Sequence, residues 1–236
     1  MTTIIPNFSQ NTMEAAVATA TEAVAEAAVA TAAEAVSEAV AEAATASAPM
    51  GSFLKGGPLP QICAFDLDYT LWNRDCDKDV VAPYTFDATS QVVLDRYGRQ
   101  ASAFQDVASA LGALVDAGVK IAFLSRNPSA DSIRQLLKVC PLHSSDPSKK
   151  TLWDALPSED YFHAYSSNMW GKGKDRHFNN LRRLTGVEFS QMLFFDDLYD
   201  NVVAAAAQGT TTIHINRNGV TWAALEAGIN GWRNRS

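Results

Sequence analysis

The chain has 236 residues, of which 47% are hydrophobic and 19% charged, and its formal net charge at pH 7 is −7. This length suffices for one ample domain or two small ones, with the composition of a soluble globular protein. The acidic balance offers no general basic field, so we expect neither a nucleic-acid partner nor binding to an anionic membrane surface. No apolar stretch of 18 or more residues lacks charge, and we therefore expect no transmembrane span.

The three cysteines, Cys63, Cys76 and Cys140, show neither the spacing of a metal site nor an even-numbered disulfide framework. Free thiols indicate a reducing compartment, so we expect a cytoplasmic protein. The sequence leaves the oligomeric state open, and a monomer is the working expectation.

Residues 1–58 differ in composition from the rest of the chain. Between residues 13 and 48 the chain is mostly Ala, Val, Glu and Thr, and no Lys or Arg precedes Lys55. The hexapeptide EAAVAT occurs at residues 14–19 and again at 26–31. Ala and Glu favour helix, Val and Thr weaken it, and the segment has the charge pattern of neither a secretory signal nor a transit peptide. We expect a partly helical low-complexity extension and linker over residues 1–58 and a folded domain over residues 59–236.

An apolar run at residues 62–65 leads directly into Asp66, and Asp68 follows two residues later. Such a run, bounded by polar residues, is typical of a buried strand in a parallel sheet. Side chains two residues apart in an extended chain point the same way, so the two carboxylates could face one pocket at the strand's carboxyl end. Two carboxylates held together repel unless a cation joins them, and Mg²⁺ suits oxygen ligands and a phosphate. Taken alone, the pair could also be a strand end with two solvated acids.

Residues 73–100 are polar and irregular, and their apolar residues could form short strands. A hairpin or loop in this segment could lie over the pocket and select substrates. Beyond this segment, apolar periodicity predicts alternating helices and strands. The expected helices span residues 101–117, 129–139, 174–184, 201–208 and 221–227, and the expected strands span residues 119–124, 161–165, 192–195 and 211–215. This alternation argues for an α/β fold with a doubly wound parallel sheet.

Polar clusters stand where three of the predicted strands end. They are Asp66 with Asp68, Ser125 with Arg126, and Asp196 with Asp197. Because parallel strands end at the same edge of a sheet, three such clusters are hard to explain by solvation alone.

In this order the residues resemble the four motifs of the haloacid dehalogenase superfamily: DLDYTL at residues 66–71, then Ser125, Lys174 and the acid pair at 196–197. FDLDYTLW at residues 65–72 and TGVEFSQMLFFDD at residues 185–197 resemble the magnesium-dependent phosphatase-1 family in particular. The resemblance leaves out the Ala-rich extension. It implies a Rossmann-like three-layer fold with sheet order 3-2-1-4-5, a small cap or none, and a site between the first and fourth strands.

The resemblance also implies roles for the acids. Asp66 would be the nucleophile that forms an aspartyl-phosphate, and its second oxygen would bind Mg²⁺. Asp68 would act first as general acid and then as general base, while its backbone carbonyl reaches the metal. In the fourth motif, Asp197 matches the metal-binding acid, and Asp196 beside it remains an alternative or supporting ligand.

The same resemblance implies a phosphate-binding set. Ser125 and the backbone N–H of Arg126 would hold a phosphate oxygen, and Lys174 would neutralise the phosphoryl group and Asp66. Lys172 competes for that role because the segment reads GKGK, but Lys174 has the matching spacing to the His-Phe pair that follows. Without the motif, a Ser-Arg pair is more often a helix cap and a single Lys a solvated surface charge.

The implied function is that of a Mg²⁺-dependent phosphomonoester hydrolase, acting on phosphotyrosine in proteins, on sugar phosphates or on both. Too few residues separate Asp68 from Ser125 for a large mobile cap, so we expect an open site. Substrate choice is the property that can least be inferred from the family, because residues 73–100 and 140–159 depart from the family pattern. One alternative is a signalling receiver that stores phosphate on an aspartate, although a receiver has no need of Asp68. Another is a catalytically silent binding module with a partner-recruiting extension, against which the intact acid and lysine set argues.

Overall fold

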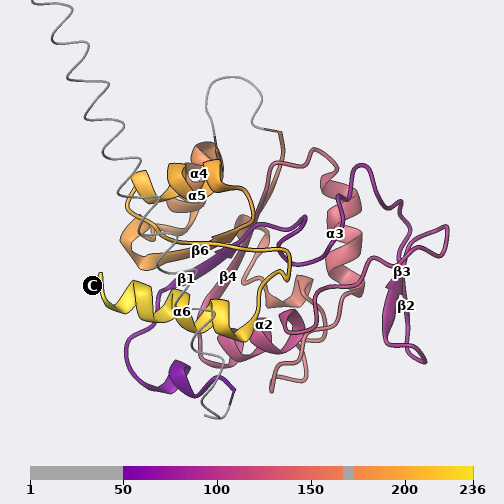
Figure 1. The fold of residues 1–236 in the computed structure, drawn as a ribbon, viewed down its shortest axis with the longest axis horizontal. Helices are drawn as coiled ribbons and strands as arrows, with labels where there is room; N and C mark the ends of the chain where they lie inside the picture. The colour runs from indigo at the N-terminus through magenta and orange to yellow at the C-terminus, as the bar shows by residue number, and fades with distance from the viewer. Residues whose placement is uncertain (1–49, 167–172, 236) are drawn as a thin grey trace, which may run out of the picture.

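A five-stranded parallel sheet forms the centre of the structure, a computed structural model that describes residues 50–166 and 173–235 (Figure 1). Its strands are β1 (Ile62–Phe65), β4 (Lys120–Ser125), β5 (Phe162–Ala164), β6 (Met192–Asp196) and β7 (Thr211–His214). Their spatial order is β5-β4-β1-β6-β7 with parallel pairings throughout, which confirms the predicted order 3-2-1-4-5. Residues 1–49 of the extension and linker predicted at residues 1–58 lie outside the described residues, as does the competing Lys172.

Burial on both faces of the sheet explains why these short segments are strands. All four residues of β1, all five of β6 and the last five of β4 are buried, as the near-continuous apolar runs in the sequence require. Phe65 pairs with Phe123 on one side and with Phe195 on the other. The residues that follow these three strands therefore meet at one edge of the sheet.

Within the described residues, helices cover both faces of the sheet. They are α2 (Val107–Asp116), α3 (Ala130–Val139), α4 (Asp175–Thr185), α5 (Tyr199–Ala207) and α6 (Trp222–Arg233). Helices α4 and α5 lie on one side of the sheet, and α2 and α6 lie on the other (Figure 1). Short 3-10 turns occur at η2 (Ser52–Lys55), η3 (Trp153–Ala155), η4 (Glu159–Tyr161) and η5 (Phe189–Gln191). None of the helices in the described part of the chain is both long and apolar enough to cross a membrane.

The start of the first long helix differs from the sequence prediction. The predicted helix at residues 101–117 begins only at Val107. The preceding residues pair with other segments instead, and the Ala101 N–H donates to the Val93 carbonyl at 2.8 Å. Tertiary pairing here overrides the helical spacing of the apolar residues.

The last helix, α6, also differs from its prediction, since it runs to Arg233, six residues beyond the expected end at 227. Its second half contains two glycines, which weaken a helix in sequence. Packing overrides this weakness, because Ile229 and Trp232 are buried. Gly228 is needed for that packing: a Cβ atom there would lie 2.9 Å from the Phe195 ring.

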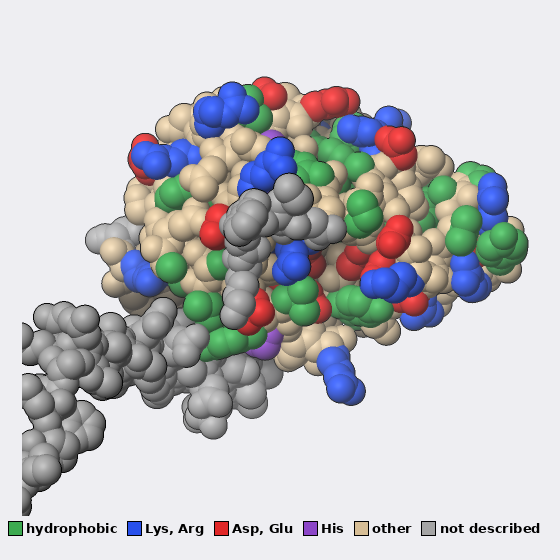
Figure 2. All heavy atoms as spheres, turned by 90° about the horizontal axis from the view of Figure 1, so that it is seen from above, with side chains coloured by type: hydrophobic (Ala, Val, Ile, Leu, Met, Phe, Trp, Pro, Cys, Tyr) green, Lys and Arg blue, Asp and Glu red, His purple; other side chains and the backbone are tan. Residues whose placement is uncertain are grey.

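Residues 73–100 fold into a loop and an antiparallel hairpin, β2 (Thr85–Asp87) and β3 (Val92–Leu94). The short strands expected in this segment are thus confirmed, although the hairpin stands at one end of the molecule (Figure 1). Val93 attaches it to the core with 1% of its surface exposed. Hydrophobic and basic side chains gather on the surface at this end (Figure 2).

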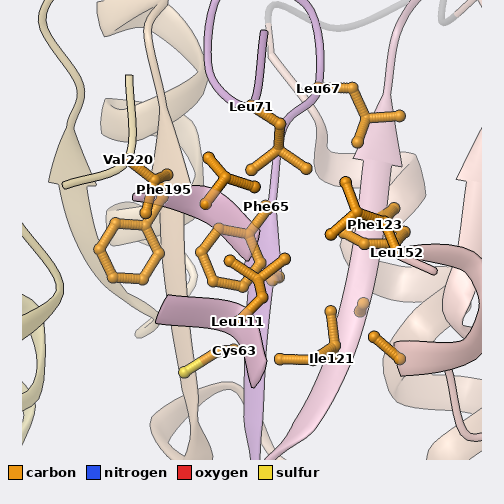
Figure 3. Packing of buried hydrophobic residues seen from close by; sticks show 14 of the residues in the cluster. Cys63, Phe65, Leu67, Leu71, Leu111, Ile121, Phe123, Leu152, Phe195 and Val220 are labelled. Carbon is orange, nitrogen blue, oxygen red and sulfur yellow. The ribbon is translucent and has the colours of Figure 1, made fainter. Parts of the chain in front are cut away.

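The apolar core anchors the loop that carries the first acids. The rings of Phe65 and Phe195 stack with centroids 5.0 Å apart, and Leu111 of α2 lies beside Phe65 (Figure 3). Leu67 and Leu71 continue this packing beyond the end of β1 and are fully buried. The acidic loop is therefore held by its apolar residues, which fixes where its polar side chains stand.

The segment around η2 packs against the last helix. Leu54 is 8% exposed, and Phe53 meets Trp222 edge-on with ring centroids 6.3 Å apart. Arg233 Nε donates to the Pro58 carbonyl at 2.9 Å. Residues 52–58, which the sequence prediction places in the linker, therefore contact the folded domain.

Candidate active site

A pocket of about 320 Å³ opens at the carboxyl edge of the sheet, above β1, β4 and β6. The polar residues that line it include Asp66, Asp68, Asp75, Asp77, Lys78, Ser125, Arg126, Asn127, Lys174, Asp197 and Asn201. The three clusters that the sequence placed at strand ends thus converge on one site. Asp196 lies beneath it, fully buried.

The floor of the pocket is an ion cluster around Lys174. The Lys174 ammonium contacts Asp66 Oδ1, lies 2.7 Å from Asp196 Oδ2 and donates to the Leu124 carbonyl at 2.5 Å. Asp66, Lys174 and Asp196 have at most 7% of their surface exposed. Burial disfavours the ammonium form, but Asp196 and Asp66 outweigh it and raise the pKa of Lys174. Lys174 is therefore a fixed positive charge.

The acids in this cluster outnumber the cations. Asp66, Asp196 and Asp197 each offer a carboxylate oxygen, and these oxygens lie within 4.8 Å of one another. Burial raises the pKa of Asp66 well above its ordinary value despite Lys174. Burial and the charge of Asp196 likewise raise the pKa of Asp197. A bound cation would relieve this repulsion, so the donor set suits a hard divalent ion.

The two acids of the fourth motif, Asp196 and Asp197, differ in how many hydrogen bonds and ion pairs their carboxylate oxygens make. Asp196 accepts hydrogen bonds at both oxygens, from the Leu198 N–H at 2.8 Å and from Asn201 Nδ2 at 3.0 Å, besides its ion pair with Lys174. Asp197 is half-buried, and its Oδ1 lies 3.5 Å from the Thr70 hydroxyl. Asp197 therefore has the more available carboxylate for a ligand in the pocket.

Thr70 links the first and fourth motifs. Its hydroxyl oxygen accepts the Asp197 N–H at 3.2 Å and lies 3.3 Å from Asp66 Oδ2. The side chain is fully buried. It holds the ends of β1 and β6 in one arrangement.

Asp68 reaches the pocket through a loop and not through strand alternation, because β1 ends at Phe65. The backbone of the next residue, Tyr69, has φ +60°, a conformation that few non-glycine residues adopt. Burial raises the pKa of the Asp68 carboxyl, although N–H donors from Asn127 and Trp72 act to lower it. The expectation that Asp68 faces the same pocket as Asp66 holds, but for a different geometric reason.

Ser125, the last residue of β4, and Arg126, which follows it, both line the pocket. Ser125 is buried, and its hydroxyl oxygen accepts the Asn127 N–H at 3.1 Å. The Arg126 guanidinium donates to Asn201 Oδ1 at 3.2 Å. Asn201 thus joins the second motif to Asp196 of the fourth.

The position of Lys174 depends on the backbone before it. Gly173 has φ +91°, and a Cβ there would lie 2.5 Å from Ala204 Cβ. A glycine is therefore required where the chain passes α5 and begins α4. His177, one turn further on, places its Nε2 2.8 Å from the Ser125 carbonyl and 3.1 Å from the Tyr165 carbonyl. The Lys-to-His spacing noted in the sequence thus ties α4 to the end of β4.

One functional residue of the pocket was not predicted from the sequence. It is Asn127, whose Nδ2 donates to Asp68 Oδ2 at 2.6 Å, and its only signal was its place directly after Ser125 and Arg126. The wall loop, residues 74–79, contributes Asp75, Asp77 and Lys78 to the pocket lining, which confirms the expectation that a loop within residues 73–100 lies at the pocket.

Comparisons with known proteins place these motifs in a family. A family model described as Acid Phosphatase matches residues 58–235. Human magnesium-dependent phosphatase 1 is 33% identical over 171 residues, which are 72% of this chain and 86% of that protein. A HAD-like hydrolase superfamily protein of Schizosaccharomyces pombe is 28% identical over 145 residues, or 61% of this chain and 79% of that protein.

The similarity of this chain to solved structures is lower than its similarity to these relatives. The N-terminal part of a Bacteroides fragilis protein, which contains a phosphatase domain complexed with Mg, is 14% identical with a TM-score of 0.44. That match covers 77% of this chain and 41% of the other, so the chain spans less than half of that structure.

Proposed function

The chain belongs to the acid phosphatase family, within the haloacid dehalogenase superfamily, and on that premise we propose that it hydrolyses phosphomonoesters with Mg²⁺ through an aspartyl-phosphate on Asp66. The observation that carries the proposal is the cluster of Asp66, Asp196 and the half-buried Asp197, in which Lys174 pairs with Asp66 and Asp196. Phosphoryl transfer needs an in-line nucleophile and positive charge to stabilise the equatorial oxygens. The cluster supplies the nucleophile and one cation, and its surplus negative charge suits a second.

Mg²⁺ would be held by Asp66, by Asp197 with Asp196 in support, and by the backbone carbonyl of Asp68. Carboxylate and carbonyl oxygens are the ligands that this ion prefers. When bound, it would neutralise the phosphate and polarise the phosphorus for attack. The surplus of acids over cations in the floor is what favours this assignment.

Asp66 attacks the phosphorus atom, and the bond from phosphorus to the leaving oxygen breaks. Asp68 gives its proton to that oxygen. Ser125 and the Arg126 N–H hold a non-bridging phosphate oxygen, and Lys174 favours the ionised form of Asp66, as the bound cation would, and faces the transferred group. Asp68 then takes a proton from the water that attacks the aspartyl-phosphate, which releases phosphate and restores Asp66.

The proposed substrates are aryl phosphates such as phosphotyrosine and, secondarily, sugar phosphates. Tyr69 and Leu198 line the pocket with 41% and 51% of their surfaces exposed. An aromatic leaving group could contact both while its phosphate reaches Asp66. The small insert between Asp68 and Ser125 supports access for a phosphate on a protein surface.

A panel of phosphate esters, assayed with and without Mg²⁺, tests this function. We expect turnover of an aryl phosphate and a phosphotyrosyl peptide with Mg²⁺, little in excess chelator, and none with Asp66→Asn. A receiver that only stores phosphate would give one equivalent of phosphoenzyme and no sustained turnover. Full activity in excess chelator would contradict the metal assignment.

The Asp68→Asn variant tests the division of labour between the two acids. General acid–base catalysis is typically worth about 10²–10⁴-fold. An aryl phosphate with an acidic phenol should still phosphorylate Asp66 in rapid-quench experiments and then stall at hydrolysis. An alkyl phosphate should already fail at the first step. Equal loss of the first step on both substrates would show that Asp68 acts through structure instead.

A further inference from the structure

We propose that Asn127 is a positioning residue that holds the Asp68 carboxylate in the geometry needed for proton transfer. This inference rests on the proposed function, because it assigns Asn127 a task within the reaction given to Asp68. The observation behind it is a clamp on both oxygens of the carboxylate. Its donors come from two segments, the loop that follows Asp68, which contributes Trp72 and Cys76, and the loop after β4, which contributes Asn127.

One side of the clamp is the Asn127 amide. Its Nδ2 donates to Asp68 Oδ2 at 2.6 Å and lies 3.2 Å from Asp75 Oδ1. Its Oδ1 accepts the Ser129 N–H at 2.9 Å. A backbone N–H can only donate, so this bond fixes the amide with its NH₂ group toward Asp68.

The other side of the clamp holds Asp68 Oδ1. Trp72 Nε1 donates to it at 2.9 Å, and the Cys76 N–H donates at 3.2 Å. Trp72 is fully buried and Cys76 is 3% exposed, so these donors do not move easily. Without Asn127, the carboxylate would still be held at one oxygen but free to turn about that contact.

The clamp matters because Asp68 lies on a loop beyond the end of β1. Strand register fixes Asp66, whereas the orientation of the Asp68 carboxylate depends on side-chain contacts. Proton transfer requires the donor and acceptor atoms within about 2.6–3.2 Å. A displacement of roughly 1 Å can cost about 10²-fold in rate. Asn127 therefore acts through Asp68, by controlling the position of the acid–base group.

The wall loop belongs to the same arrangement. Ser129 Oγ donates to Asp77 Oδ1 at 2.5 Å, and Asp75 Oδ2 pairs with Lys78 at 2.6 Å. The start of α3 and the wall loop are thus tied together beside Asn127. A carboxylate at position 127 would face both Asp68 and Asp75, so an amide is the side chain of this size that fits.

The test is the Asn127→Leu variant, which keeps the branched shape of the side chain and removes its hydrogen bonds to Asp68, Asp75 and the Ser129 N–H. On an alkyl phosphate we expect kcat to fall about 10–100-fold with KM changed by less than about threefold. The rate of the first step on an aryl phosphate with an acidic phenol should fall much less. Asn127→Gln, which keeps the amide, should recover part of the loss, and Asn179→Leu on the exposed face of α4 is the matched control with no expected change.

A double-mutant cycle separates positioning from a general structural effect. On the Asp68→Asn background, Asn127→Leu should cause no further loss, because the group that it positions no longer transfers protons. If Asn127→Leu folds poorly, Asn127→Ala carries the same comparison. Unchanged kcat in the single variant, or an equal loss on both backgrounds, would overturn the positioning role. Absence of turnover in the wild type, or full activity of Asp68→Asn, would instead overturn the proposed function.

Discussion

The floor of the pocket and the segment at residues 73–103 differ in how deeply their charged side chains are buried. In the floor, Asp66, Lys174 and Asp196 are buried, and they stand at the ends of strands and at the start of a helix. In the segment, most charged side chains reach solvent, as in the pair of Lys78 with Asp75, where the lysine side chain is 76% exposed. The floor is therefore fixed by the sheet, whereas the segment is held by local hydrogen bonds.

This difference in burial suggests that the floor carries out the chemistry and that the segment selects the substrate. Buried charges in a low dielectric interact strongly, so the floor can stabilise a transferring phosphoryl group but tolerates little change. Surface pairs contribute little and can vary. We expect substitutions in the floor to affect both folding and turnover, and substitutions in the segment to affect mainly which substrates bind.

The largest expected effect follows from Lys174→Met. This change leaves Asp66 and Asp196 buried without their cation, and breaking a buried ion pair typically costs about 3–5 kcal/mol. We expect a loss of that order in the free energy of unfolding at pH 7, measured by urea denaturation, together with loss of turnover. The loss should shrink in acid, because protonated carboxyls no longer need the ammonium.

The matched control for Lys174→Met is Lys78→Met, at the exposed end of the wall loop. Its ion pair with Asp75 lies at the surface, so stability should change little. Equal destabilisation by the two substitutions would mean that the floor and the wall loop do not differ as described.

The next effect is a pH dependence due to His177. Burial, with a smaller contribution from the charge of Lys174, lowers the pKa of His177 from 6.5 to about 4. Between pH 6.5 and 4 the unfolded state then binds one more proton than the folded state, so stability falls as the pH falls through this window. Relative to His177→Gln, the wild type should lose up to about 3 kcal/mol across it. Parallel stability curves for the two proteins between pH 7 and 4 would contradict a buried neutral ring.

Much of the floor was predictable from the sequence, because its residues follow buried strands. The apolar runs before Asp66 and Asp196 set the strands, and parallel pairing brings their ends together. The order of the sheet and the convergence of the three polar clusters follow from this rule. Lys174 was chosen over Lys172 from its spacing to a His-Phe pair, and the structure places Lys174 against Asp66.

The clamp around Asp68 was not predictable in the same way. Its donors, from Trp72, Cys76 and Asn127, come from loops, and loop contacts have no sequence period. The predicted start of α2 and the predicted end of α6 were wrong for a related reason. Backbone pairing outweighed local helix propensity at the first, and close packing outweighed it at the second. Periodicity thus located the elements, and contacts between elements set their limits.

A third effect concerns the contribution of residues 52–58, around η2, to the stability of the domain. Two truncations separate its contribution: removal of residues 1–50 keeps Leu54, and removal of residues 1–58 deletes it. Leu54 is 8% exposed, and full burial of such a side chain contributes about 1.5–3 kcal/mol. The longer truncation should therefore lower the melting temperature relative to the shorter one, which should match the full chain. Equal melting temperatures for the two truncations would place the start of the folded domain after residue 58, as the sequence alone suggested.

The smallest expected effect follows from Tyr97→Ser on the hairpin. Tyr97 is 69% exposed, and Arg99 lies over its ring at 5.3 Å. Surface substitutions of this kind usually change stability by less than about 0.5 kcal/mol, which corresponds to a shift of at most about 2 °C in the melting temperature of a domain of this size. Val93→Ala, at the base of the same hairpin, is the comparison, because Val93 is 1% exposed and its truncation removes buried apolar surface. We expect Val93→Ala to lower the melting temperature by several degrees while both variants turn over a small aryl phosphate at the wild-type rate. If Tyr97→Ser instead lowers turnover of the small substrate, the hairpin acts on the pocket floor, and the separation of the two regions fails.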